Sequence, residues 1–225
     1  MMEDVQTDLA VKAEISLYYD LRLPQDASPK TPLLIAVHGY GAHKRYMMRE
    51  AMGIAPEHFA IASIQGPHQH YRPSRSGGYR VGFGWLTSHR PEEYIKLHHD
   101  LIIQITERLA DEGKIDPGRV WLFGFSQASA LNFRFALSHP EFLYGHIAVC
   151  GGIPGDIDTS TNYQPSRGRT LYLYGTEDEF YTQEQFREFD EKLAKLLPDY
   201  RSAQFDAGHE ITEQMRQRMR EFLAS

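Results

Sequence analysis

The sequence predicts an α/β protein with a mainly parallel central sheet and helices on both faces of that sheet. Short apolar runs of strand length alternate along the chain with longer amphipathic runs of helical length, which is typical of βαβ units. Several of the short runs are apolar throughout, as expected for strands buried on both faces. Because the 225 residues show no repeat and no shift in composition, we expect one domain over 1–225.

The N-terminal half begins with a strand and contains the clearest helix. The run 15–24 alternates apolar and polar residues, which predicts an antiparallel edge strand. One helix is predicted over 42–53, and a second over 91–113 begins at Pro91 with two acids in its first turn. The apolar stripe predicted for the second helix consists of Tyr94, Leu97, Leu101, Ile105 and Leu109. The buried strands predicted in this half are 32–39, 58–66 and 119–125.

The C-terminal half continues the alternation of strands and helices. Strands are predicted over 144–152, 169–178 and 200–208. The helices predicted in this half are 127–138, 182–199 and 210–225. The apolar face predicted for the last helical run consists of Ile211, Met215, Met219 and Phe222.

Composition and charge exclude several classes of function. The 24 Lys and Arg and 30 Asp and Glu give a net charge of −6, and no dense basic tract indicates a nucleic-acid binder. No apolar run reaches the roughly 20 residues that cross a bilayer, and the early acids of the N-terminus do not fit a signal peptide. The single cysteine, Cys150, lies in an apolar strand-like run and is expected to be a buried core thiol. We therefore expect a cytoplasmic protein without nucleic-acid partners or a membrane span.

A serine stands where a buried strand turns into a helix. In the stretch "VWLFGFSQASALNFRFAL", Ser126 is flanked two residues away by Gly124 and Ala128. Gly-x-Ser at a strand-to-helix junction is the signature of a nucleophile elbow, in which small neighbours let strand and helix approach closely. The full pattern ends in Gly, whereas this chain has Ala. The alternative for Ser126 is a simple N-cap of the helix 127–138.

Two further residues supply the partners that a nucleophilic serine needs. Asp178 ends the predicted strand-like run 169–178 and enters the following loop, and His209 follows the predicted strand 200–208. A serine requires a base, and the base requires an orienting acid. The order Ser, Asp, His is that of α/β-hydrolases, and each residue follows the carboxyl end of a strand, where ligands gather in parallel sheets. The alternatives for the acid are Glu177, Glu179 and Asp206.

The stretch "LLIAVHGYG" predicts an oxyanion hole. It ends a buried strand in a His-Gly motif of the kind that supplies one backbone donor to a developing oxyanion. The N–H groups of Tyr40 and Gln127 are the predicted donors, each contributing about 3 kcal/mol to the lowering of the barrier. His38 is expected to hold the turn rather than to act as a base.

These motifs together resemble a known family. "HGYG", "GFSQAS", "GTEDEF" and "GHEI", in that order over residues 38–211, look like the phospholipase/carboxylesterase family of α/β-hydrolases, which includes acyl-protein thioesterases. The resemblance implies an α/β-hydrolase fold without a separate lid domain and no cofactor. It assigns Ser126 as nucleophile, Asp178 as acid, His209 as base, and Tyr40 and Gln127 as oxyanion donors. Family members commonly have glycines where this chain has Ala128-Ser129.

The segment 66–91 resists assignment to a helix or strand because it is rich in Gly, Pro, Arg and aromatic residues. A long loop in a compact domain is usually functional, so we expect a substrate-pocket loop lined by Phe83 and Trp85, with core packing of those two rings as the alternative. Three arginines, Arg72, Arg75 and Arg80, either bind an anionic group or are solvated. The histidines at 68, 70, 98 and 99 lack the spacing of metal ligands, so no metal site is predicted.

The sequence thus predicts a serine hydrolase that cleaves carboxylic esters, or thioesters, through an acyl-enzyme on Ser126. Its partner is a small-molecule ester, and a homodimer is one assembly that stays open. The alternatives are a serine peptidase of the same fold and a non-catalytic binding protein.

Overall fold

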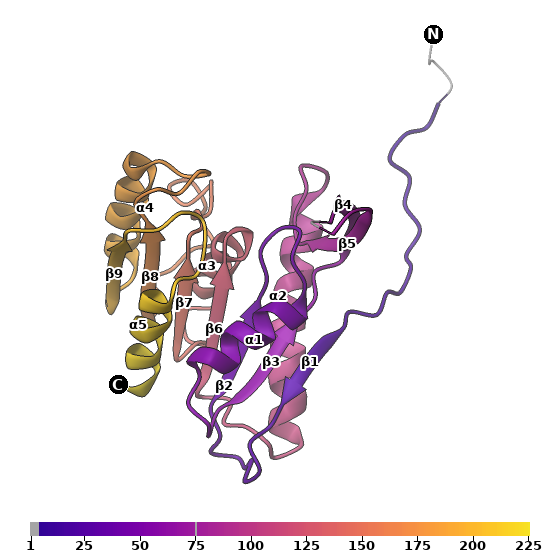
Figure 1. The fold of residues 1–225 in the computed structure, drawn as a ribbon. Helices are drawn as coiled ribbons and strands as arrows, with labels where there is room; N and C mark the ends of the chain where they lie inside the picture. Colours follow the sequence, from indigo (N-terminus) through magenta and orange to yellow (C-terminus); the bar gives the residue numbers. More distant parts are fainter. Residues whose placement is uncertain (1–4, 75) are drawn as a thin grey trace.

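A seven-stranded sheet forms the centre of the computed structural model, which describes residues 5–74 and 76–225 (Figure 1). The strand order is β1-β3-β2-β6-β7-β8-β9. All neighbouring strands are parallel except β1, which pairs antiparallel with β3 at the edge. The predicted parallel sheet and antiparallel edge strand are confirmed. The strands are β1 Tyr19–Arg22, β2 Leu33–Val37, β3 Ala60–Ile64, β6 Val120–Phe125, β7 Gly145–Val149, β8 Arg169–Gly175 and β9 Tyr200–Phe205.

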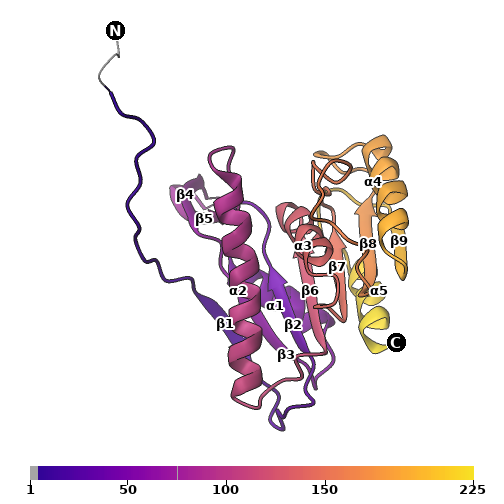
Figure 2. The same cartoon turned by 180° about the vertical axis from the view of Figure 1, so that it is seen from behind.

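Helices cover both faces of the sheet, as predicted. Helices α1 and α5 pack on one face, and α2, α3 and α4 pack on the other (Figures 1 and 2). In the described part of the chain, no helix is both long and apolar enough to cross a bilayer. The helices are α1 Lys44–Ile54, α2 Pro91–Asp111, α3 Gln127–Ser138, α4 Gln183–Leu196 and α5 Glu213–Ala224.

Strand β2 illustrates why its run is apolar throughout. Its alternate residues Leu33, Ile35 and Val37 pack with α2 and α3, whereas Leu34 and Ala36 pack with α1 and α5. All five residues are 0% exposed. Because successive side chains point to opposite faces, a strand between two helical layers has no position left for a polar residue. The carboxyl end of β2 is therefore held rigidly, and the turn that follows inherits that fixed position.

The segment 66–91, which we expect to be a long loop at the substrate pocket, includes two strands. It contains a hairpin of β4 His68–Pro73 and β5 Tyr79–Gly84, separate from the main sheet. Its composition resembles that of a loop because many of its residues are exposed, but its two strands pair with each other through their backbones. Residue 75 lies outside the described residues, and so does the expectation for Arg75.

The buried face of α2 differs from the predicted stripe in its first half. His98 and Ile102 are buried there instead of Leu97 and Leu101, while Ile105 and Leu109 are buried as predicted. His98 packs edge-on against Trp85, which follows the hairpin. The face that α2 buries thus follows from the contact between His98 and Trp85, which cannot be predicted from the spacing of apolar residues along the helix. By contrast, Met215, Met219 and Phe222 are buried on α5 as predicted, and Ile211 is buried just before the helix begins.

Four histidines of the interior titrate far below their ordinary range. Burial lowers the pKa of His98 and His146 to about 3, and of His38 and His99 to about 4. In the unfolded chain each pKa returns to about 6.5. Above pH 6.5 both states are neutral and the full stability is present. As the pH falls from 6.5 towards 4, only the unfolded state takes up protons, so stability is lost.

We therefore expect the free energy of unfolding to fall by about 1 kcal/mol or more for each of these histidines between pH 7 and pH 5. Urea denaturation at pH 7, 6 and 5 measures this slope. His146→Asn is expected to flatten the slope, whereas His58→Asn, at an exposed histidine, is expected to leave it unchanged. A free energy of unfolding independent of pH over this range would contradict the prediction.

Candidate active site

Ser126 occupies a sharp turn between β6 and α3. Its backbone has φ 58° and ψ −122°, which is the left-handed side of the map that residues with a Cβ rarely occupy. The hydroxyl makes no capping hydrogen bond to α3, so the N-cap alternative does not describe this side chain. Its Oγ instead lies 2.8 Å from Nε2 of His209. The strained turn thus presents the hydroxyl to another loop rather than to its own helix.

Small residues make room for this turn. A Cβ on Gly124 would lie 2.6 Å from Nδ2 of Asn132 and 3.1 Å from the backbone carbon of Ala128. On the opposite side, a Cβ on Gly151 would lie 2.2 Å from the carbonyl oxygen of Ser126. Gly124 and Ala128 therefore allow the close approach expected of them, and Gly151, which sequence reasoning missed, does the same from the end of β7.

The three residues predicted to form a relay lie in hydrogen-bonding contact. Nδ1 of His209 is 2.9 Å from Oδ2 of Asp178, and Nε2 of the same ring is 2.8 Å from Oγ of Ser126. They come from loops after β6, β8 and β9, which end at the same edge of the sheet. Because Nδ1–H donates to the carboxylate, Nε2 is left to accept from the serine hydroxyl.

Asp178 is held more firmly than the rival acids. Its side chain is 0% exposed, and Oδ1 accepts hydrogen bonds from the amides of Phe180 at 2.9 Å and Tyr181 at 3.1 Å. Glu179 accepts from the backbone N–H of His209, not from its ring, while Glu177 and Asp206 are exposed. Only Asp178 of the four acids therefore contacts the imidazole.

Aromatic rings fix the imidazole from two sides. Phe125 lies 4.9 Å from the ring centroid of His209, and Phe180 lies 4.6 Å from it in an edge-to-face arrangement. Phe180 follows Asp178 by two residues, so one short loop supplies both the carboxylate and a packing partner. No sequence signal separates Phe180 from an ordinary exposed aromatic residue, because its function depends on where the β9 loop lies.

Two backbone N–H groups next to Ser126 have no acceptor within the described residues, those of Tyr40 and Gln127. Gln127 is the first residue of α3, where an amide has no intrahelical partner. The turn of Tyr40 is close to the serine, since a Cβ on Gly39 would lie 3.0 Å from Cβ of Ser126. An anion near Oγ would therefore find two unoccupied donors.

The hairpin holds this turn in place. The amide of Gly41 donates to the carbonyl of Phe83 at 2.7 Å, and the amide of Phe83 donates to the carbonyl of Ala42 at 3.1 Å. The side-chain Oε1 of Gln127 accepts from the amide of Trp85 at 2.9 Å, and its Nε2 donates to the carbonyl of Leu86 at 3.2 Å. Gln127 thus ties the segment after β5 to the elbow with its side chain.

His38 is a structural residue, as expected. Its Nδ1–H donates to the carbonyl of Gly39 at 2.8 Å, and Nε2 accepts from the amide of Gly66 at 2.9 Å and from the side chain of Gln65 at 2.8 Å. This pattern requires the neutral ring, in agreement with the low pKa that burial gives it. A neutral, fully paired imidazole has no free nitrogen for acid–base chemistry.

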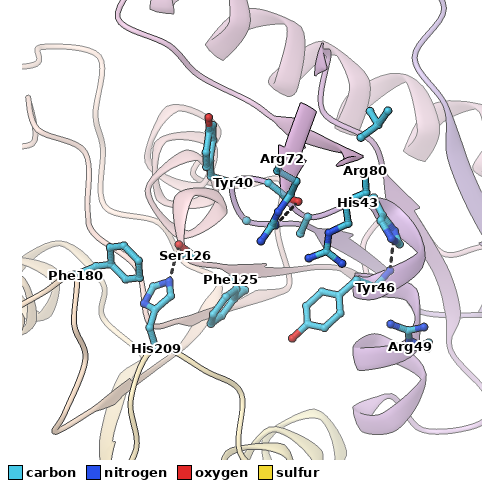
Figure 3. A pocket seen from close by; sticks show the side chains of 14 residues that line it. Tyr40, His43, Tyr46, Arg49, Arg72, Arg80, Phe125, Ser126, Phe180 and His209 are labelled. Atoms are coloured by element: carbon cyan, nitrogen blue, oxygen red, sulfur yellow. Dashed lines mark hydrogen bonds between the residues drawn. The ribbon is translucent and has the colours of Figure 1, made fainter. Parts of the chain in front are cut away.

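A pocket of about 680 Å³ opens beside the elbow (Figure 3). Its walls come from the turn 39–43, from α1, from the hairpin and from the loops of Phe180 and His209. Phe83 and Trp85, expected either to line the pocket or to pack on the core, are not among its lining residues. Trp85 is 0% exposed because its ring packs on His38 and its indole N–H donates to the carbonyl of His38 at 3.0 Å.

The fit around the elbow predicts a large cost for any side chain at position 151. Gly151→Ala is expected to lower the free energy of unfolding by about 1–3 kcal/mol, because the new Cβ meets backbone that cannot move without shifting Ser126. Gly53→Ala in α1 is the matched control, since nothing lies within 4 Å of that Cβ. It is expected to leave stability unchanged or to raise it by up to ~1 kcal/mol. Urea denaturation of both variants decides, and equal stabilities would refute the close fit.

Comparisons with known proteins agree with this architecture. The chain superposes on esterase PE8 with a TM-score of 0.75 and 19% identity, covering 93% of this chain and 99% of that one. The Bacillus cereus carboxylesterase gives a TM-score of 0.71 at 15% identity, with 92% and 93% covered. Zea mays acyl-protein thioesterase 2 gives 0.70 at 13% identity, with 92% and 97% covered. These likenesses establish the α/β-hydrolase fold.

Sequence comparison extends the agreement to the family. The chain is 25% identical over 135 residues to NocK of Nocardia uniformis subsp. tsuyamanensis. The match spans 55% of this chain but only 33% of that relative. The model of the phospholipase/carboxylesterase family matches residues 21–225, nearly the whole chain. The resemblance seen in the four motifs is therefore confirmed, and the chain belongs to the phospholipase/carboxylesterase family of hydrolases.

Proposed function

We propose that this hydrolase cleaves carboxylic esters through an acyl-enzyme on Ser126, with His209 as the base and Asp178 as the orienting acid. The observation that carries the proposal is the unbroken relay in which Nε2 of His209 lies 2.8 Å from Oγ of Ser126 and Nδ1 lies 2.9 Å from Asp178. Distances of this size suit proton transfer between a nucleophile and its base.

The reaction proceeds in two steps of the same kind. Oγ of Ser126 attacks the ester carbonyl while His209 takes the hydroxyl proton, and the oxygen that becomes negative binds the amides of Tyr40 and Gln127. The tetrahedral intermediate collapses, and the alcohol leaves with the proton from His209. Water then attacks the acyl-enzyme in the same way, and the carboxylic acid is released with Ser126 restored.

The buried carboxylate of Asp178 has two functions in this scheme. It holds the imidazole in the tautomer that can accept a proton at Nε2, and its negative charge stabilises the imidazolium after the transfer. Its second oxygen is fixed by two backbone amides, so it stays oriented during the reaction. A thioester differs only in its leaving atom, and matched oxygen and sulfur esters in one assay distinguish the two substrates.

Ser126→Ala is expected to reduce kcat on a short-chain 4-nitrophenyl ester by about 10⁴-fold or more and to abolish labelling by a fluorophosphonate probe. Asp178→Asn is expected to reduce kcat by about 10⁴-fold. Ser88→Ala, at an exposed serine, is the control for a hydroxyl lost elsewhere. Near wild-type activity in Ser126→Ala, with the protein folded by circular dichroism, would refute the assignment.

Gln127→Leu tests the contribution of the side chain separately from that of the backbone donor. The substitution keeps the amide but removes the bonds to Trp85 and Leu86, so the elbow and the turn of Tyr40 lose their fixed spacing. We expect kcat to fall by about 10-fold or more with a smaller change in KM, because small misplacements of oriented groups are costly. Gln127→Glu keeps the acceptor for Trp85 and is expected to restore part of kcat. Equal kcat values for the wild type and Gln127→Leu would exclude this positioning function.

A further inference from the structure

The pocket beside Ser126 carries a one-sided charge. Three arginines line it, Arg49, Arg72 and Arg80, and among the residues that the structure describes no aspartate or glutamate does. The chain as a whole has a net charge of −6, so this pocket is positive although the protein is negative overall. A pocket lined by charges of one sign attracts a ligand of the opposite sign.

These guanidinium groups have no carboxylate partner among the described residues. Ion pairs within 4 Å occur at many other arginines, but not at these three. The nearest acid along α1, Glu50, is already bound by Arg216 at 2.8 and 3.2 Å. Within residues 5–74 and 76–225, no carboxylate therefore neutralises these three guanidinium groups, although carboxylates pair with arginines elsewhere.

The hairpin places two of these charges in direct opposition. Arg72 on β4 and Arg80 on β5 are cross-strand partners, and like charges at such positions destabilise a strand pair. The same two arginines also line a second hollow of about 520 Å³ that continues along the hairpin. The repulsion between Arg72 and Arg80 destabilises the hairpin, and the chain has more acids than bases yet places none beside them in the described residues. Because both arginines line a pocket, we expect an anionic ligand to neutralise their charge.

Neighbouring groups respond to the same field. Burial, followed by the charges of Arg49, Arg45, Arg80 and Lys44, lowers the pKa of His43. Figure 3 shows His43 and the three arginines on the side of the pocket opposite Phe180 and His209, with Ser126 between. One ligand in this pocket can therefore reach both the hydroxyl and the arginines.

We propose that the substrate carries an anionic group, a carboxylate or a phosphate, that binds Arg49, Arg72 and Arg80 while its ester carbonyl lies at Ser126. The inference rests on the proposed function of Ser126. Guanidinium groups suit both anions because their forked N–H donors match the spacing of two oxygens. Arg72 already donates to the carbonyl of Gly41, so its remaining N–H groups serve the ligand, whereas Arg49 and Arg80 are exposed and free to turn towards it.

The test compares esters that differ only in charge. The 4-nitrophenyl monoester of glutarate is set against 4-nitrophenyl valerate, which places the anion on the acyl side. On the alcohol side, 4-acetoxybutyrate is set against butyl acetate, and 3-acetoxypropyl phosphate is set against pentyl acetate, in a pH-stat. We expect kcat/KM for at least one anionic ester to exceed that of its neutral partner by about 10-fold, and the ratio to decline as salt is raised.

The variants assign the preference to the pocket. In the Arg49→Gln/Arg80→Gln double variant the ratio of anionic to neutral kcat/KM is expected to fall about 10-fold, whereas Arg187→Gln, an exposed arginine on α4, is expected to leave it unchanged. Arg80→Gln is also expected to raise the melting temperature, because it removes the like-charged pair with Arg72. A merely structural arginine would lower it.

Failure of this inference is distinguishable from failure of the proposed function. A ratio near one for every anionic ester, in a protein that hydrolyses neutral esters through Ser126, overturns only the anionic site. If no ester is hydrolysed, the melting temperature with glutarate or inorganic phosphate decides. A rise that the double variant loses supports the site, and no rise with either anion overturns it.

Discussion

The parallel pairing of β6, β7, β8 and β9 is the constraint on which the site depends. Their register brings the carboxyl ends of β6, β8 and β9 to one edge, so residues 31 and 83 positions apart along the chain meet within hydrogen-bond distance. The intervening strand β7 supplies no reacting side chain. It supplies Gly151 instead, which gives the elbow the space that a larger residue would fill.

The strain at Ser126 is sustained by this packing. A residue with a Cβ at such φ and ψ costs about 1–3 kcal/mol, and the surrounding strands and α3 leave it no relaxed alternative. Cys150, just before Gly151, also has a positive φ of 46°. Two neighbouring loops therefore each hold a residue with a Cβ at an unfavourable positive φ. Such strain is expected where a scaffold maintains a particular geometry rather than maximal stability.

The sequence could predict the residues that the sheet positions, because strand ends follow from apolar runs and turns. Ser126, Asp178 and His209 each follow a run that is visible in the sequence. The hairpin could not be predicted in this way, since its strands alternate polar residues with exposed aromatics and its partners include the turn at Gly41 and Ala42. The same limitation explains Trp85. Its position under His38 depends on an acceptor that only the folded chain provides, and aromatic content alone does not distinguish a lining ring from a buried one.

The pocket has two sides of different origin, and Arg72 connects them. The sheet edge builds the side with the relay, while α1 and the hairpin build the side with the arginines. Arg72 donates to the carbonyl of Gly41, in the same turn that carries the amide of Tyr40, and it packs so closely that a Cβ on Gly82 would lie 3.0 Å from its Cδ. An anion bound by Arg72 would therefore also stabilise the turn that carries the proposed oxyanion donor, the amide of Tyr40. In the proposed scheme, binding energy from a remote, unreactive part of the substrate would thus act at the reacting carbonyl, as transition-state complementarity requires.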